Sequence, residues 1–247
     1  MRPIQPETAA STTYVRAVFD TYASVTGLDR PLQSKYDTLA CNFRPLLAEL
    51  PDDARVLDIG SGQGELLMLC RQLGIAAEGV DVSAELVEAN VRRGLRVTCI
   101  DRLQDYLAAC ANEWDAVFMI DVLEHFAKAE AFEILGLLRA RALKRGGVLV
   151  VQVPNMASPF ATLNLYHDIT HEWSYTPTSI AQILRVVGFA NVRVRPANYP
   201  MKGLSVPRAA VRKIVYLLLR ALLVVDQPNR TSILTPNLIA VAARDDT

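Results

Sequence analysis

The pattern of apolar and polar residues predicts alternating strands and helices over most of this 247-residue chain. Short, nearly continuous apolar runs, typical of strands buried on both faces, are separated by segments with apolar residues at helical spacing. The predicted strands span residues 55–60, 76–82, 96–101, 115–121, 147–154, 191–196 and 237–244, and the predicted helices span 36–50, 64–74, 83–94, 102–110, 128–144 and 176–188. This order favours an α/β fold with a mostly parallel sheet, covered by helices on both faces.

The same pattern divides the chain into one large domain and two appendages. Residues 1–35 are polar and mixed, which predicts an N-terminal arm with a helix, and residues 36–247 form the domain. Residues 197–236 are an insertion between the last two strands. Ser83 is expected to cap its helix, and Gly74 and Gly94 are expected to end theirs.

The insertion contains an apolar run that predicts a helix over residues 208–225. At the helical period, five polar or basic residues fall within one arc of about 140°: Arg208, Arg212, Lys213, Tyr216 and Arg220. The helix could be a lid or dimer helix packed on the domain, or an interfacial helix on an anionic membrane surface. A transmembrane span is disfavoured, because the run is interrupted by Arg220 and is shorter than the ~20 apolar residues that cross a bilayer.

Composition narrows the class of protein. The formal net charge is zero, so nothing favours a nucleic-acid partner, which usually demands a basic excess. The four cysteines, Cys41, Cys70, Cys99 and Cys110, form no CxxC pair and are expected to be buried free thiols. The N-terminus lacks the apolar core of a signal peptide, which predicts a cytoplasmic protein, with peripheral contact at the inner membrane as the alternative that the insertion raises.

Candidate ligand-binding residues follow successive predicted strands. The first strand runs into a loop with glycines at Gly60, Gly62 and Gly64, where the main chain can turn sharply and a ligand can approach it closely. Asp58 precedes the first glycine, which disfavours a pyrophosphate and favours a cationic ligand. The strand after it ends at Asp81, where a carboxylate can accept both hydroxyls of a ribose. The next two strands end at Asp101 and Asp121.

The segments "VLDIGSGQG", "GVDVS", "ID" and "DVLEH" together resemble the ordered motifs of class I S-adenosylmethionine (SAM)-dependent methyltransferases. The resemblance covers about residues 35–200 and the last strand, and it implies a Rossmann-like, seven-stranded sheet with a reversed C-terminal β-hairpin. It implies that SAM is bound by Asp58, Gly60, Ser61, Gly62, Gln63, Asp81, Val82, Asp101, Arg102, Leu103, Ile120, Asp121 and His125. Many relatives have Cys at the position of Ser61.

The segment "VPNMASPFATLNLYHDITHEWSYTPTSI" follows the fifth strand and, apart from its final helix signal, predicts an irregular substrate loop. With "DVLEH", it resembles small bacterial O-methyltransferases of polysaccharide gene clusters and of the ubiquinone type. That resemblance implies O-methylation of a sugar, glycan or glycolipid hydroxyl. His171 is then the candidate general base, Asp168 its orienting group or a substrate ligand, and His125 a neighbour of the sulfonium.

Several alternatives stay open on the sequence alone. His125, His167 and His171 could each be a structural hydrogen-bonding residue, and Tyr166, Trp173 and Tyr175 could stack on a sugar or belong to the core. Asp121, Asp168 and His171 could also bind a hard cation, but no adjacent acid pair is present, so no metal is expected.

Other functions also fit parts of the sequence. The acceptor could be a small molecule or quinone precursor, or the protein could bind SAM without catalysis. A nicotinamide enzyme is disfavoured by Asp58 and by the GxGxG spacing. The oligomeric state is open, with a homodimer as one option.

Overall fold

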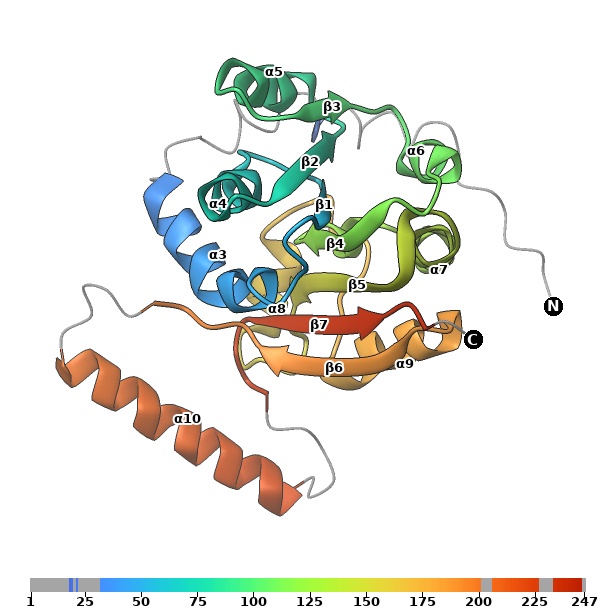
Figure 1. Ribbon diagram of the computed structural model, residues 1–247. Helices are drawn as coiled ribbons and strands as arrows, with labels where there is room; N and C mark the ends of the chain where they lie inside the picture. Colours follow the sequence, from blue (N-terminus) through green and yellow to red (C-terminus); the bar gives the residue numbers. More distant parts are fainter. Residues whose placement is uncertain (1–17, 20, 22–31, 201–205, 227–232, 246–247) are drawn as a thin grey trace.

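The computed structural model describes residues 18, 19, 21, 32–200, 206–226 and 233–245. Its centre is a seven-stranded sheet with the order β3-β2-β1-β4-β5-β7-β6 (Figure 1). The strands are β1 (Arg55–Ile59), β2 (Ala76–Asp81), β3 (Val97–Cys99), β4 (Trp114–Ile120), β5 (Leu143–Pro154), β6 (Ala190–Pro196) and β7 (Asn237–Ala243). The predicted fold class and all seven predicted strands are confirmed, with shifts at their ends.

The predicted reversed hairpin is also confirmed. Strands β1 to β5 pair in parallel, whereas β7 is antiparallel to both of its neighbours, β5 and β6. Strand β6 therefore runs in the same direction as β5. As a result, the carboxyl ends of six strands lie at one edge of the sheet, the edge at which ligands bind in such folds.

Helices cover both faces of the sheet, and strict alternation along the strands explains the two faces. Val56, Ala116 and Phe118 pack with helices α3 (Leu32–Leu47) and α4 (Glu65–Leu73). Leu57 and Val117 point to the other face, under α6 (Leu103–Ala109), α7 (Lys128–Leu137) and α9 (Pro177–Val187). Because successive side chains of a strand point to opposite faces, continuous apolar runs are what this two-sided burial requires.

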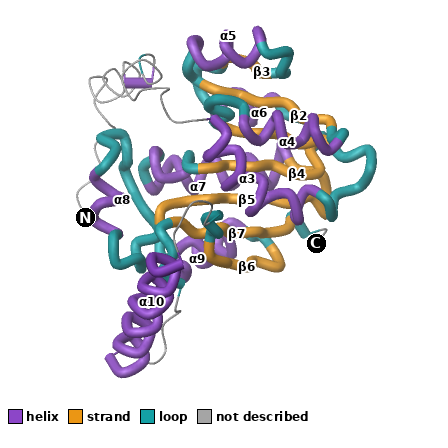
Figure 2. The backbone as a smooth tube through the Cα atoms, turned by 90° about the vertical axis from the view of Figure 1, so that its left-hand side faces the viewer, coloured by secondary structure: helices purple, strands orange, loops and turns teal. Residues whose placement is uncertain are grey.

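The other helices lie outside these two layers. Helix α5 (Ala84–Arg92) flanks β2 and β3, and a 3₁₀ turn (Leu123–His125) follows β4. Helix α8 (Ala161–Tyr166) follows β5, and α10 (Val206–Asp226) connects β6 to β7. Figure 2 shows α8 and α10 on the same side of the sheet. No helix among the described residues is long and apolar enough to cross a membrane.

Some local predictions were wrong. Helix α3 begins at Leu32 rather than at residue 36, and α7 passes into a π-helical turn (Leu138–Ala142) that leads directly into β5. Helix α8 lies in a segment expected to be irregular, and its short length explains why no periodic signal revealed it. Gly74 and Gly94 adopt left-handed conformations after their helices, as predicted. Ser83 occupies its expected N-cap position, but its hydroxyl makes no capping bond.

The cysteine prediction was half right. All four are free thiols, but only Cys70 and Cys110 are buried, whereas Cys41 and Cys99 are exposed. The short strand β3 leaves Cys99 near the border of the sheet, where an apolar sequence context does not guarantee burial.

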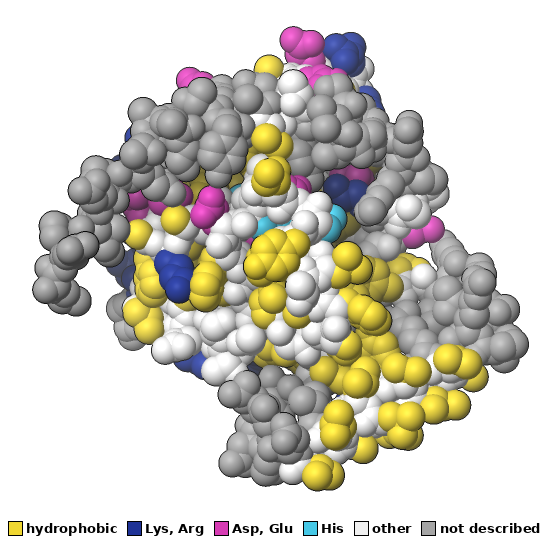
Figure 3. All heavy atoms as spheres, turned by 180° about the vertical axis from the view of Figure 1, so that it is seen from behind, with side chains coloured by type: hydrophobic (Ala, Val, Ile, Leu, Met, Phe, Trp, Pro, Cys, Tyr) yellow, Lys and Arg dark blue, Asp and Glu magenta, His cyan; other side chains and the backbone are white. Residues whose placement is uncertain are grey.

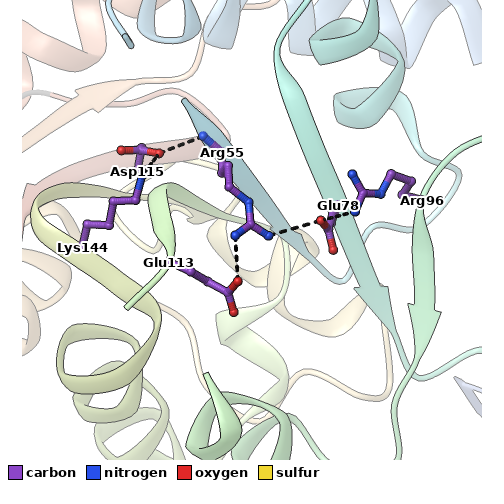
Figure 4. Close-up of polar contacts among 6 residues, drawn as sticks. All are labelled: Arg55, Glu78, Arg96, Glu113, Asp115 and Lys144. Atoms are coloured by element: carbon purple, nitrogen blue, oxygen red, sulfur yellow. Dashed lines mark hydrogen bonds and ion pairs between the residues drawn. The ribbon is translucent and has the colours of Figure 1, made fainter. Parts of the chain in front are cut away.

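A network of charged residues lies near the amino ends of the central strands (Figure 4). The Arg55 guanidinium pairs with Glu113 at 2.8 Å and Glu78 at 3.3 Å, and the Arg55 amide donates to Asp115. Asp115 also pairs with Lys144 at 2.7 Å, and Glu78 with Arg96 at 2.6 Å. These bonds link β1, β2 and β4 at the edge of the sheet opposite to the candidate ligand edge.

Asn155 links the candidate substrate loop to the sheet. Its side chain is completely buried, donates to the carbonyls of Ile233 and Thr235, and accepts from the amide of Ala157. Asn155 also forms a parallel bridge with Tyr175, at the far end of the loop. One side chain thus joins the end of β5 to the chain that enters β7.

We expect Asn155→Ala to destabilise the protein by about 2–4 kcal/mol, because it leaves buried backbone groups without partners. Chemical denaturation, monitored by circular dichroism, measures the loss. Gln182→Ala, at an exposed amide on α9, is the control and should change stability by less than about 0.5 kcal/mol. Equal effects of the two substitutions would contradict the role of Asn155.

Candidate active site

The glycine-rich loop turns sharply between β1 and α4. Gly60, Gly62 and Gly64 have φ of 66°, 51° and 79°, in the left-handed region that favours glycine. A Cβ at Gly60 would lie 2.5 Å from a Val122 methyl group, and one at Gly64 would lie 2.5 Å from the Asn90 side-chain oxygen. Space as well as conformation therefore requires glycine at Gly60 and Gly64, whereas Gly62 borders open space.

Asp81 and Asn90 hold this loop in place. The Asp81 carboxylate accepts the amide of Gly62 at 2.8 Å and that of Ser83 at 2.9 Å. The fully buried Asn90 side chain donates to the Gly62 carbonyl at 2.8 Å. Sequence reasoning found Asp81 but missed Asn90, because an Asn inside an amphipathic helix gives no signal of a distant partner.

The methionine end of the predicted SAM site carries an excess of buried negative charge. Asp58 and Glu65 are almost fully buried, and burial, followed by repulsion from Glu65 and Asp81, raises the pKa of Asp58 well above its ordinary range. The facing cation is Lys35, 3.6 Å from Glu65, which sequence reasoning missed. Ser61 lies nearby in sequence, buried, with a hydroxyl that has no hydrogen-bond partner. These residues fit a ligand that brings an ammonium group and further polar atoms.

Other residues predicted to bind SAM lie at or just after the ends of neighbouring strands. Val82 and Ile120 are half-buried, Leu103 is buried, and Asp101 and Arg102 are exposed. Gln63 is half-buried in the glycine-rich loop. The structure therefore brings the predicted residues to one edge of the sheet, while their individual roles stay predictions.

Asp121 stands in an unusual backbone conformation directly after β4. Its φ is 55°, which is rare for a residue with a side chain and is often retained at functional sites. Its carboxylate accepts hydrogen bonds from Gln152 and Asn237, so strands β5 and β7 hold it in position. The sequence placed Asp121 at the ligand edge, but only the tertiary structure shows this conformation and these partners.

The three histidines gather at the same edge. The rings of His125 and His171 are 4.9 Å apart between centroids, and those of His167 and His171 are 5.4 Å apart. Phe19, from the N-terminal arm, meets the His125 ring edge-on at 5.5 Å. The His171 Nδ1 lies 3.2 Å from the Leu165 carbonyl, so Nδ1 carries the proton and Nε2 keeps a free lone pair.

Asp168 and His125 are connected through Thr170. The Thr170 hydroxyl donates to Asp168 at 2.6 Å, and His125 Nδ1 lies 2.8 Å from the same hydroxyl oxygen. Because the hydroxyl proton points to Asp168, His125 donates to Thr170. Burial, followed by His171, lowers the pKa of His125 to about 4, so this imidazole is neutral and weakly basic. Of the two partly buried histidines, His171 therefore suits proton abstraction better.

Glu124 is the residue that sequence reasoning passed over in "DVLEH". It is completely buried, and neither carboxyl oxygen has a hydrogen-bond partner. Burial, followed by Asp121, raises its pKa well above the ordinary range of a glutamate. Its carbonyl accepts the amides of Glu172 and Trp173, which ties the histidine loop to the turn after β4.

The structure brings together a different group of candidate metal ligands from the one considered on the sequence alone. The group of described side chains with atoms close enough to hold an ion is Glu124, His125 and His171, within 4.8 Å of one another, rather than the expected Asp121, Asp168 and His171. Because burial of Glu124 favours its neutral carboxyl form, metal binding there has to displace a proton. The expectation of no metal stays a prediction.

The aromatic residues of the loop have different environments. Tyr175 is buried and belongs to the core, which decides one of the alternatives left open by the sequence. Tyr166 is exposed, and the Trp173 ring lies under the Lys128 ammonium at 3.5 Å from its centroid. Of these three residues, Tyr166 and Trp173 could therefore offer a ring to a bound acceptor.

Comparisons with known proteins agree with this geometry. A family model described as a methyltransferase domain matches residues 32–194. A ubiquinone biosynthesis O-methyltransferase of Xanthomonas axonopodis pv. citri (strain 306) is 33% identical over 112 residues, which cover 42% of this chain and 45% of that protein. The match thus spans less than half the length of that relative.

Solved structures share the fold. The crystal structure of a SAM-dependent methyltransferase from Archaeoglobus fulgidus is 24% identical, with a TM-score of 0.63 over 84% of this chain and 94% of that one. A 1,6-didemethyltoxoflavin-N1-methyltransferase from Burkholderia thailandensis, with bound S-adenosylhomocysteine, is 17% identical, with a TM-score of 0.64 over 100% and 93% of the two chains.

Replacing Asp81 tests the cofactor site. We expect Asp81→Ala to weaken the binding of SAM and S-adenosylhomocysteine by at least about 100-fold, because the glycine-rich loop and the start of α5 each lose a charge-assisted hydrogen bond and the predicted ribose acceptor is removed. Calorimetric titration measures the affinity. Asp101→Ala, at an exposed residue, should weaken binding less. Unchanged affinity in a folded Asp81→Ala protein would refute the assignment.

Ionisation of the buried Asp58 carboxyl should lower the stability of the protein in the absence of SAM. Its raised folded-state pKa means that ionisation opposes folding as pH rises from about 3.9, the ordinary value, through the folded value. Asp58→Asn removes this cost, so its Tm without SAM should exceed that of the wild type at pH 8 and approach it near pH 4. SAM should stabilise the variant less than the wild type.

Thermal unfolding at both pH values, with and without SAM, measures these shifts. Asp53→Asn, at an exposed acid just before β1, is the control and should leave Tm and SAM stabilisation unchanged. A lower Tm for Asp58→Asn at pH 8 would show that the Asp58 charge is balanced within the protein itself.

Proposed function

We propose that this chain, which belongs to the methyltransferase domain family and is a class I enzyme with SAM as methyl donor, methylates a hydroxyl oxygen. The observation that carries the proposal is the contact between His171 Nδ1 and the Leu165 carbonyl. This contact leaves Nε2 free to accept a proton. A hydroxyl acceptor must lose a proton during transfer, so a positioned base is the group that this chemistry needs.

The residues divide the work between holding and proton transfer. When bound, SAM supplies an electrophilic methyl group on its sulfonium. Asp81 and the glycine-rich loop hold the donor, and the acidic surroundings of Asp58 suit its ammonium. His171 Nε2 takes the proton of the acceptor hydroxyl. Neutral His125 is hydrogen-bonded to Thr170 and holds the neighbouring part of the loop in place. Most of the acceleration comes from aligning the acceptor oxygen with the methyl group.

A sugar, glycan or glycolipid is the proposed acceptor class. The loop between β5 and α9 supports this choice, because it presents the exposed Tyr166 ring and the Trp173 ring together with polar groups. The name of the Xanthomonas relative supports oxygen as the methylated atom, and it makes a quinone precursor the alternative acceptor.

Methyl transfer from labelled SAM to a panel of hydroxylated glycans, glycolipids and catechols tests the proposal. His171→Ala should lower kcat by about 10²–10⁴-fold with SAM affinity unchanged. His167→Ala is the matched control in the same loop, because His167 is exposed, and it should retain near wild-type kcat. Chelation by EDTA should leave the rate unchanged.

Three results would contradict the proposal. Transfer to nitrogen acceptors alone would exclude the hydroxyl assignment. SAM binding without turnover on any acceptor would indicate a binding protein, the non-catalytic alternative. A kcat of His171→Ala equal to that of His167→Ala would remove His171 from proton transfer.

A further inference from the structure

Helix α10 exposes its apolar side rather than burying it. Seven of its apolar side chains are between 45% and 83% exposed: Val211, Ile214, Val215, Leu217, Leu218, Leu222 and Val225. At 100° per residue they occupy an arc of about 160°. The half-buried residues Tyr216 and Leu219 lie on the opposite side of the helix. The apolar face therefore points away from the domain, the reverse of an ordinary surface helix.

This arrangement argues against a lid packed on its own domain. Figure 1 shows α10 standing apart from the sheet and from the helices that cover it. Isolated exposed apolar residues are normal, but a continuous apolar face marks a surface that meets another body.

The connectivity places this face at the site's edge of the sheet. Helix α10 leaves the carboxyl end of β6 and returns to the start of β7, and both points lie at the edge where β5 enters the histidine loop. In Figure 3, the hydrophobic side chains of α10 and the histidine side chains are seen on the same face of the molecule. On the loop, Leu163, Tyr166 and Ile169 are also largely exposed.

Charge decides between a membrane and a second copy as the partner of this face. The helix sequence contains Arg208, Arg212, Lys213 and Arg220, and no acidic residue before Asp226. At the helical period, Arg208 and Lys213 lie just outside the two edges of the apolar arc, so a symmetric dimer through this face would bring like charges together at its rim. An anionic lipid surface instead complements the charges and accepts the apolar face.

We propose that α10 is a membrane-docking helix that lies in the interface of an anionic bilayer and holds the active site at the lipid surface. The apolar arc enters the boundary between headgroups and acyl chains, and Lys213 and Arg220, both exposed, meet lipid phosphates. This inference goes beyond the proposed function and does not depend on which acceptor is methylated.

Flotation of the full chain with vesicles tests the docking. The protein should float with vesicles of phosphatidylcholine and phosphatidylglycerol, bind pure phosphatidylcholine much less, and lose affinity in 0.5 M salt. The double substitution Leu217→Gln and Leu218→Gln should weaken vesicle binding by about tenfold or more, because two apolar side chains that would enter the bilayer are lost.

The matched control is Val186→Gln on α9. Val186 and Leu217 are both 67% exposed, but Val186 lies near the start of β6, at the opposite edge of the sheet. This variant should bind vesicles like the wild type. SAM affinity should be unchanged in both proteins, which shows that each is folded.

Three results would overturn the proposal. Failure to float with anionic vesicles excludes docking, and equal loss in the Val186 control shows non-specific adsorption. A dimer in light scattering that the α10 substitutions dissociate, without vesicle binding, assigns the face to a second copy. None of these readouts depends on turnover, so they stay separate from a failure of the proposed methylation.

Discussion

The carboxylate of Asp81 joins the segments that meet at the ligand edge of the sheet. It stands at the end of β2, accepts the amide of Gly62 from the loop after β1, and accepts the amide of Ser83 at the start of α5. A loop with three left-handed residues has few hydrogen bonds of its own, so an external acceptor has to hold it. Together with the Val80 carbonyl, which accepts the amides of Gly60 and Ser61, and the Asn90 side chain, this buried carboxylate fixes the position of the glycine-rich loop.

The buried Asp81 carboxylate also affects the electrostatics of its neighbours. Asp58 and Glu65 share its surroundings, and Lys35 alone balances them among the described residues that influence the Asp58 pKa. Like charges that are buried close together raise the free energy of the protein without a ligand. A ligand with an ammonium group relieves this repulsion, so the arrangement favours binding at the expense of the stability of the free protein.

The candidate acceptor side is organised differently, by hydrogen bonds whose direction is fixed by their partners. Thr170 links Asp168 to His125, the Leu165 carbonyl fixes the tautomer of His171, and the Glu124 carbonyl receives the loop that follows. In the proposed arrangement, charge gathers at the donor site, while hydrogen-bond direction guides the proton transfer. Helix α10 leaves the same edge with its apolar face outward, so both proposed sites and the proposed docking helix share one side of the molecule.

The sequence by itself determined the order of strands and helices and the strand-end positions of Asp58, Asp81 and Asp121, because these depend on local periodicity and on the rules of βαβ connection. The reversed hairpin was predicted only from the resemblance to class I methyltransferases. Tertiary structure alone decided the partners. Asn90 and Lys35 reach the glycine-rich loop from helices, Glu124 is buried without a hydrogen-bond partner for its carboxyl group, and Asp121 takes a left-handed backbone. Such contacts join residues far apart in the chain, and no local pattern records which side chains a fold brings together or which face of a helix it leaves uncovered.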